Sequence, residues 1–161
     1  MITILTTGGT IEGLDYVGDK GINKTNVSIA DFLKRANVDL EYTIESVCKK
    51  DSRDINENDL KMLVSRIKES NATKILITHG TFTMENTAKY IGKLNLDKTI
   101  VLVGSFILGS SENTDAQFNL GYAISSIQFL KPDVYIAMNG KVFHWNNVSK
   151  NLETNKFEPN E

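Results

Sequence analysis

The sequence predicts an α/β fold with three αβα layers, in which helices cover both faces of a five-stranded, mainly parallel sheet. Short apolar runs rich in β-branched residues alternate along the chain with segments of helical periodicity. This alternation is typical of parallel sheets built from βαβ units. The runs are almost continuously apolar, as expected of strands buried on both faces. Strands are expected at residues 2–6, 42–48, 74–78, 99–103 and 134–138.

Four helices are expected between these strands. In the first two, apolar residues recur at the i, i+3, i+4, i+7 spacing that marks one face of a helix. Those residues are Ile29, Phe32, Leu33 and Ala36 in the first helix, and Leu60, Leu63, Val64 and Ile67 in the second. Ser28 and Asn56 are suitable N-caps for these two helices. The third helix is expected over residues 83–94 and the fourth over about residues 116–130.

We expect the strand order 2-1-3-4-5, as in flavodoxin-like folds, which makes the first and third strands neighbours at the topological switch point. Ligands of open α/β sheets bind at that point, outside the carboxyl ends of the strands. The sequence has no internal repeat, and residues 1–161 are expected to form one domain. The polar stretch from Asn146 onward has no core pattern and is expected to be a loosely ordered terminus.

Composition and charge argue against several classes of protein. The net charge is −2 with both signs mixed along the chain, so we expect no nucleic-acid or membrane partner. No apolar run approaches the roughly 20 residues of a membrane helix, and we see no signal peptide. The dinucleotide and Walker motifs and a zinc pattern are absent, so no cofactor and no metal are expected. Cys48 is the single cysteine; we expect a buried structural thiol and a cytoplasmic protein.

Two threonine loops are the most informative local feature. Thr10 follows Gly8 and Gly9 directly after the first strand, and Thr81 follows Gly80 directly after the third. Because those two strands are predicted neighbours, both hydroxyls are expected at one crevice. A threonine hydroxyl can act as a nucleophile when a neighbouring group takes its proton, so the pattern suggests acyl-transfer chemistry.

The residues alone leave the partner of these hydroxyls open. His79 is a candidate base, but a histidine at a strand end also commonly serves as a structural hydrogen-bonding group. A lysine can act as a base only if burial or a nearby charge lowers its pKa, and spacing does not choose among the lysines. Ser52, in the loop after the second strand, can either bind a ligand carboxylate or simply form a turn.

In several segments the chain resembles the N-terminal domain of bacterial-type L-asparaginases. Residues 4–11 (Ile-Leu-Thr-Thr-Gly-Gly-Thr-Ile) are similar to the first signature of that family, and residues 78–88 are similar to the second. The similarity continues in order through residues 98–105, 115–120, 137–140 and 147–150. The resemblance therefore covers nearly the whole chain, but without the C-terminal domain of ordinary family members.

The resemblance implies a role for several residues. Thr10 attacks the side-chain amide carbon of the substrate, while Thr81 lies on its other side and is supported by Lys150. Ser52 holds the substrate α-carboxylate, and the backbone N–H of Thr81 stabilises the oxyanion. By the same resemblance, Gly9, Gly80, Phe82 and Ser105 are expected to line the substrate site.

Two positions depart from the family pattern. Phe82 stands where the second signature has an aspartate that binds the substrate α-amino group. Ile22 falls where a mobile loop carries a tyrosine that activates the first threonine, and Tyr16 could replace that tyrosine only if the loop is rearranged.

Three hypotheses follow. The first is an asparaginase-like amidohydrolase with a threonine nucleophile; the second is a catalytically degenerate domain that binds a small ligand or a partner. The third is an amidase for substrates without an α-amino group. We expect a small amide or amino-acid ligand, and a homodimer or homotetramer in which a partner subunit covers the crevice.

Overall fold

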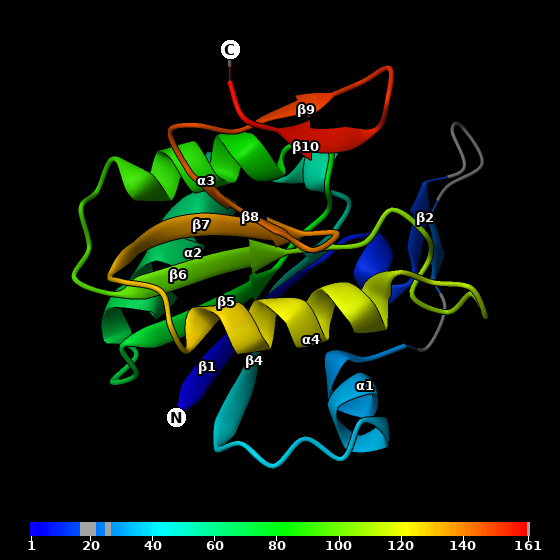
Figure 1. Ribbon diagram of the computed structural model, residues 1–161, viewed down its shortest axis with the longest axis horizontal. Helices are drawn as coiled ribbons and strands as arrows, with labels where there is room; N and C mark the ends of the chain where they lie inside the picture. Colours follow the sequence, from blue (N-terminus) through cyan, green and yellow to red (C-terminus); the bar gives the residue numbers. More distant parts are fainter. Residues whose placement is uncertain (17–21, 25–26, 161) are drawn as a thin grey trace.

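The computed structural model describes residues 1–16, 22–24 and 27–160. Its centre is a six-stranded sheet in the order β4-β1-β5-β6-β7-β8 (Figure 1). The strands are β1 (Ile2–Gly8), β4 (Tyr42–Lys50), β5 (Lys74–Thr78), β6 (Thr99–Val103), β7 (Asp133–Met138) and β8 (Lys141–His144). The first five are parallel and have the predicted order 2-1-3-4-5, so the predicted fold class is confirmed.

The sixth strand, β8, was not predicted and corrects the expected count of five. It pairs antiparallel with β7, with Tyr135 opposite His144 and Met138 opposite Lys141. The two strands are joined by Asn139 and Gly140, whose φ angles are 49° and 80°. Positive φ at both central residues is typical of the type I′ turn, which closes two-residue hairpins and favours Asn-Gly. The Asn-Gly dipeptide is therefore the signal that predicts β8.

Helices cover both faces of the sheet, as predicted. They are α1 (Ile29–Arg35), α2 (Glu57–Glu69), α3 (Met84–Gly92) and α4 (Ala116–Ile127). Both predicted N-caps form: Ser28 accepts a hydrogen bond from the Asp31 amide, and Asn56 forms a capping box with Asp59. In Figure 1, α4 lies in front of the sheet and α2 lies behind it.

The helices α1 and α4 lie side by side on the same face of the sheet. A cavity of about 50 Å³ separates Phe32 and Leu33 of α1 from Leu120 and Ile124 of α4. The β1-α1-β4 and β6-α4-β7 crossovers run in opposite directions along the sheet, so on a shared face they have opposite hands. One of them is thus an exception to the right-handed rule for parallel crossovers. The loop between β6 and α4 (residues 104–115) consequently passes over the carboxyl edge of the sheet.

The C-terminal segment is more ordered than predicted. The strands β9 (Ser149–Asn151) and β10 (Lys156–Glu158) form a small antiparallel hairpin beside the main sheet. Val148 and Phe157 are buried, and the Phe157 ring lies 6.1 Å from the Phe106 ring between centroids. These two apolar side chains anchor a segment whose polar composition had suggested a loose terminus.

A second hairpin and two short 3₁₀ turns complete the described elements. The hairpin consists of β2 (Leu14–Tyr16) and β3 (Ile22–Lys24), and the turns are η1 (Thr10–Glu12) and η3 (Ser52–Asp54). In the described ranges, no helix has the length and apolar character needed to cross a membrane.

Candidate functional site

The two threonine loops meet through their glycines at the carboxyl ends of β1 and β5. A β-carbon built on Gly9 would lie 2.6 Å from the Gly80 nitrogen and 2.7 Å from its Cα, so the two backbones are in direct contact. Gly9 also has a φ of 80°, which L-residues with a side chain rarely adopt. Gly9 and Gly80 therefore bring the neighbouring residues Thr10 and Thr81 to one place.

A cavity of about 150 Å³ lies at this junction. It is lined by Thr10, Asp51, Ser52, Arg53, Gly80, Thr81, Phe82 and Lys150. All three residues predicted as catalytic and three of the five predicted as substrate-binding are among them. Asp51 and Arg53 had not been singled out, although their charged run after the second strand places them at the same edge. A cavity of about this volume can hold a molecule the size of benzene.

Two predicted substrate-binding residues do not line the cavity. Gly9 lies behind it, in contact with Gly80. Ser105 is buried, and its hydroxyl donates a hydrogen bond to the carbonyl oxygen of Ile107 at 2.8 Å. That bond fixes the start of the loop between β6 and α4.

Lys150 reaches the cavity from strand β9. Its ammonium donates a hydrogen bond to the Thr81 hydroxyl, with an Nζ–Oγ1 distance of 3.1 Å. Its backbone N–H donates to a Glu85 carboxylate oxygen at 2.7 Å, which ties β9 to α3. Burial, together with the positive charge of Arg53, lowers the pKa of Lys150 below its usual value. The lysine is therefore held against Thr81 in an environment that makes its charged form less favourable than it is in water.

Thr10 is the first residue of the η1 turn and is half-buried. Its carbonyl oxygen accepts a hydrogen bond from the Gly109 amide at 2.9 Å, so the loop between β6 and α4 is attached to this turn. Within the described part of the chain, no side chain forms a hydrogen bond with the Thr10 hydroxyl. The backbones of Tyr16 and Ile22 pair in the β2–β3 hairpin. The expectation that one of these residues stands at the position of the family's activating tyrosine concerns their side chains, which lie outside the described part of the structure.

Phe82 forms a half-exposed wall of the cavity next to two cations. Its side chain is 54% exposed. The Arg53 guanidinium carbon lies 5.3 Å from the ring centroid, and Lys150 Nζ lies 5.9 Å from it. Both distances are in the range of cation–π interactions.

Arg53 also forms a forked ion pair with Asp51. Its Nε and Nη2 donate to the two carboxylate oxygens at 2.8 and 3.1 Å. Burial tends to raise the pKa of Asp51, but the hydrogen bonds and charge of Arg53 outweigh it and lower the pKa. Asp51 is consequently ionised and already paired.

His79 is fully buried and has a structural environment. Its Nδ1 lies 2.7 Å from the Gly80 carbonyl oxygen, and its Nε2 lies 2.9 Å from the Thr87 hydroxyl. Burial lowers its pKa to about 4. This neutral imidazole does not line the cavity. Its contacts with the Gly80 carbonyl oxygen and the Thr87 hydroxyl connect the Gly80 loop to α3. Cys48 is half-buried rather than fully buried, and it is similarly unreactive because burial raises the pKa of its thiol to about 11.

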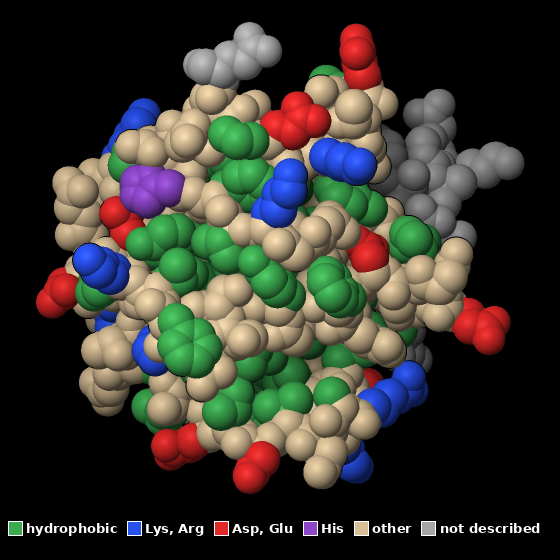
Figure 2. Space-filling model, in the orientation of Figure 1, with side chains coloured by type: hydrophobic (Ala, Val, Ile, Leu, Met, Phe, Trp, Pro, Cys, Tyr) green, Lys and Arg blue, Asp and Glu red, His purple; other side chains and the backbone are tan. Residues whose placement is uncertain are grey.

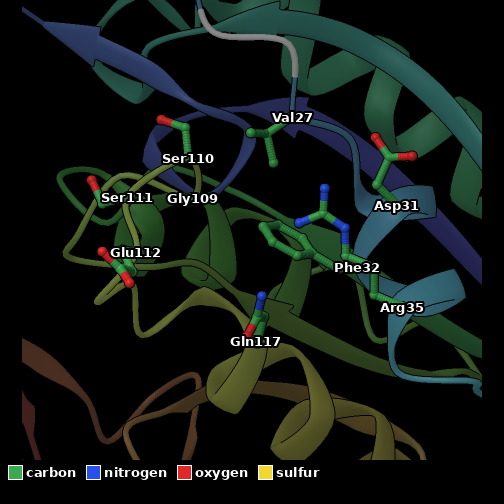
Figure 3. A pocket seen from close by; sticks show the side chains of 9 residues that line it. All are labelled: Val27, Asp31, Phe32, Arg35, Gly109, Ser110, Ser111, Glu112 and Gln117. Carbon is green, nitrogen blue, oxygen red and sulfur yellow. The ribbon is translucent and has the colours of Figure 1, made fainter.

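A larger cavity, of about 330 Å³, lies between α1 and the loop that precedes α4. Figure 3 shows Phe32 and Arg35 of α1 facing the loop that carries Ser110, Ser111 and Glu112. Its charged side chains are exposed, and none of them forms a hydrogen bond with another lining residue. We therefore place the candidate site in the smaller cavity, where buried polar groups converge. No group of three or more potential metal ligands occurs within the described ranges.

The fold and this cavity define an α/β domain with hydroxyl and lysine side chains at the switch point of its sheet. Residues 1–158 match the family model described as the N-terminal domain of asparaginase. The chain belongs to the asparaginase family.

The chain is also similar in sequence or structure to individual named proteins. The chain is 31% identical to a glutaminase-asparaginase of Pseudomonas fluorescens biotype A, over 98% of its own length and 48% of the relative. It is also 31% identical to L-asparaginase 2 of Escherichia coli K12, over 95% of its length and 47% of that protein. The structure of a thermostable L-asparaginase from Thermococcus kodakarensis matches with a TM-score of 0.77 and 29% identity, over 98% of this chain and 50% of that one. The chain thus spans about half the length of these relatives.

Proposed function

We propose that this domain carries the nucleophile of an amidohydrolase that hydrolyses a small side-chain amide. The observation that carries the proposal is the 3.1 Å hydrogen bond between Lys150 and Thr81 in a cavity that Thr10 and Ser52 also line. A lysine with a lowered pKa beside a hydroxyl is one arrangement that activates such chemistry. Family membership supports the same reaction class.

In the proposed reaction, the Thr10 hydroxyl oxygen attacks the amide carbon and gives up its proton. A tetrahedral oxyanion forms, and the backbone N–H of Thr81 donates a hydrogen bond to it. When the intermediate collapses, the C–N bond breaks and ammonia leaves with the transferred proton. Water then hydrolyses the threonine ester and regenerates Thr10. The Thr81–Lys150 pair provides the proton relay, and Ser52 binds the substrate at the cavity wall.

The direct test is ammonia release from a panel of amides with and without an α-amino group. We expect hydrolysis of at least one of them, and Thr10→Ala should remove about 99% or more of that rate with little change in the free energy of unfolding. Thr73→Ala is the matched control because Thr73 is exposed and directly precedes β5, at the opposite end of that strand from Thr81. Full activity of Thr10→Ala would exclude Thr10 as the nucleophile.

The alternative proposal is a catalytically degenerate domain that binds a small ligand or a partner. Phe82 favours it, because this exposed ring stands where the family signature has an aspartate. Micromolar binding of an amide or amino acid without any ammonia release would support this alternative. For either function we propose a homodimer or homotetramer, which light scattering at micromolar concentration can test.

A further inference from the structure

Among the described residues, the charged side chains that line the candidate cavity are Asp51, Arg53 and Lys150, so positive charge exceeds negative charge in this described lining. Asp51 and Arg53 neutralise one another in their forked ion pair. Lys150 has no carboxylate within 4 Å of its ammonium among the described residues. When Lys150 is protonated, its charge is a surplus positive charge at the cavity wall.

The Lys150 ammonium contacts no negative group among the residues that the structure describes. There it contacts the Thr81 hydroxyl and the faces of two phenyl rings, with Nζ 5.9 Å from the Phe82 centroid and 5.2 Å from the Phe106 centroid. Ring faces attract a cation only weakly compared with a paired charge. A partly buried ammonium in this environment is stabilised by any anion that enters the cavity.

A second cation in the ligand would meet the opposite situation. An α-ammonium group placed near Phe82 would lie close to Lys150 and would find no unpaired carboxylate among the described residues that line the cavity. Like charges at such distances repel one another, and the repulsion is strongest where water is partly excluded. The cavity is therefore matched to ligands that carry a carboxylate and is mismatched to zwitterionic amino acids.

We propose that the cavity selects ω-amides of simple dicarboxylic acids, which bear a carboxylate but no α-ammonium group, and that Phe82 and Lys150 set this preference. This inference rests on the proposed function in placing the substrate among Thr10, Ser52 and Thr81. It makes the ligand carboxylate the counter-ion of Lys150 whenever that lysine carries a proton, including the proton that it takes up in the relay. It also gives Phe82 a role in specificity, because the ring closes the wall without adding a negative charge.

The test compares ligand pairs that differ only in the α-ammonium group. Calorimetric titration of the whole chain with succinate and with L-aspartate measures the preference without any turnover. We expect succinate to bind at least tenfold more tightly than aspartate. Phe82→Asp should reduce or invert that ratio because it supplies a carboxylate, whereas Phe82→Leu should keep it. Phe129→Asp, at a side chain that is 85% exposed outside the cavity, is the control for an added negative charge elsewhere.

Turnover of succinamate and L-asparagine separates this inference from the proposed hydrolysis. Preferential binding of succinate without ammonia release from any amide would support the selectivity and contradict the hydrolysis. Hydrolysis of asparagine as efficient as that of succinamate would overturn the selectivity while supporting the hydrolysis. Equal affinities for succinate and aspartate, or no binding of either at millimolar concentration, would also overturn it.

Discussion

Gly9 and Gly80 touch backbone to backbone, and this contact sets the distance between the two threonine loops. The contact leaves no room for a β-carbon on Gly9, because that atom would lie 2.6 Å from the Gly80 nitrogen. The positive φ of Gly9 adds a further conformational requirement.

Replacing Gly9 should therefore affect stability and activity together. Gly9→Ala is expected to lower the free energy of unfolding by about 2 kcal/mol or more, through backbone strain and steric overlap. It should also reduce amide hydrolysis because it pushes Thr10 away from Thr81. Urea denaturation and ammonia release measure the two effects. Gly121→Ala is the matched control: a β-carbon added there would meet no described atom within 4 Å, and alanine in an exposed helix should stabilise by about 0.5–1 kcal/mol.

Thr81 and Lys150 should behave as one unit. Thr81→Ala and Lys150→Met are each expected to reduce kcat by about 100-fold or more, because each leaves the other without its proton-transfer partner. The double variant should be scarcely slower than either single one. A double-mutant cycle on kcat measures this coupling, and strictly multiplicative effects would show that the two residues act independently.

The charge of Arg53 should control the pH dependence of the reaction. Burial and Arg53 both lower the pKa of Lys150, so removing the guanidinium should raise that pKa. If neutral Lys150 accepts a proton, kcat increases with pH as Lys150 loses its own proton. Arg53→Gln should therefore move this rising limb of the kcat–pH profile to higher pH. Arg35→Gln, at an exposed arginine outside the cavity, should leave the limb in place. A limb that moves to lower pH in Arg53→Gln would contradict the role of Lys150 as the acceptor.

His79 should make the protein sensitive to mild acid. Burial lowers its pKa from 6.5 to about 4, so between these values the unfolded chain binds a proton that the folded chain does not. The free energy of unfolding should consequently fall as the pH drops from about 6.5 to 4, by up to about 3 kcal/mol. Above pH 6.5 both states are neutral and this contribution to the pH dependence vanishes.

Urea denaturation at several pH values tests this expectation. His79→Gln should be less stable at pH 7 but should lose less stability on acidification than the natural sequence. His144 is the control histidine: burial opposes its protonation, but hydrogen bonds with Asp133 and Asn146 raise its pKa overall. Because folding raises the pKa of His144, its effect on the pH dependence of stability lies mainly above pH 6.5, so His144→Gln should keep the loss of stability on acidification. Identical slopes for the natural protein and His79→Gln would refute the assignment.

The sequence was sufficient to predict the parallel part of the sheet and most of the cavity. The β-branched runs and the 3.6-residue period specify the buried strands and helices, and their alternation predicts a parallel sheet. The flavodoxin-like order was an additional assumption, which the structure confirms. Thr10 and Thr81 were predicted to converge because they follow neighbouring strands. Lys150 is different: only the family resemblance identified it, since no local pattern shows that β9 folds back over α3.

Other features depend on tertiary contacts that a linear pattern does not contain. The C-terminal hairpin is held by Val148 and Phe157, two isolated apolar residues in a polar segment. Arg53 belongs to a charged loop, and its position against the Phe82 ring becomes visible only in three dimensions. The shared face of α1 and α4 could not be expected either, because the usual handedness rule places these helices on opposite faces.

Figure 2 shows hydrophobic side chains distributed over the face of the molecule on which α4 lies. Phe118 of α4 is 61% exposed and stacks on Tyr122 with a centroid distance of 6.3 Å. The stacked pair gives the proposed oligomer a candidate contact that is separate from the Thr10–Thr81 cavity.

The position of Lys150 outside the main sheet has a consequence for the integrity of the site. The lysine is carried by a three-residue strand that is held by the Glu85 carboxylate, by its pairing with β10 and by the nearby buried side chains of Val148 and Phe157. A single proteolytic cut in the exposed turn between β9 and β10 would release Phe157 from its covalent connection and loosen Lys150, while all six strands of the main sheet stayed intact. A short synthetic peptide that carries the residues of β10 should then restore the position of Lys150 by non-covalent complementation.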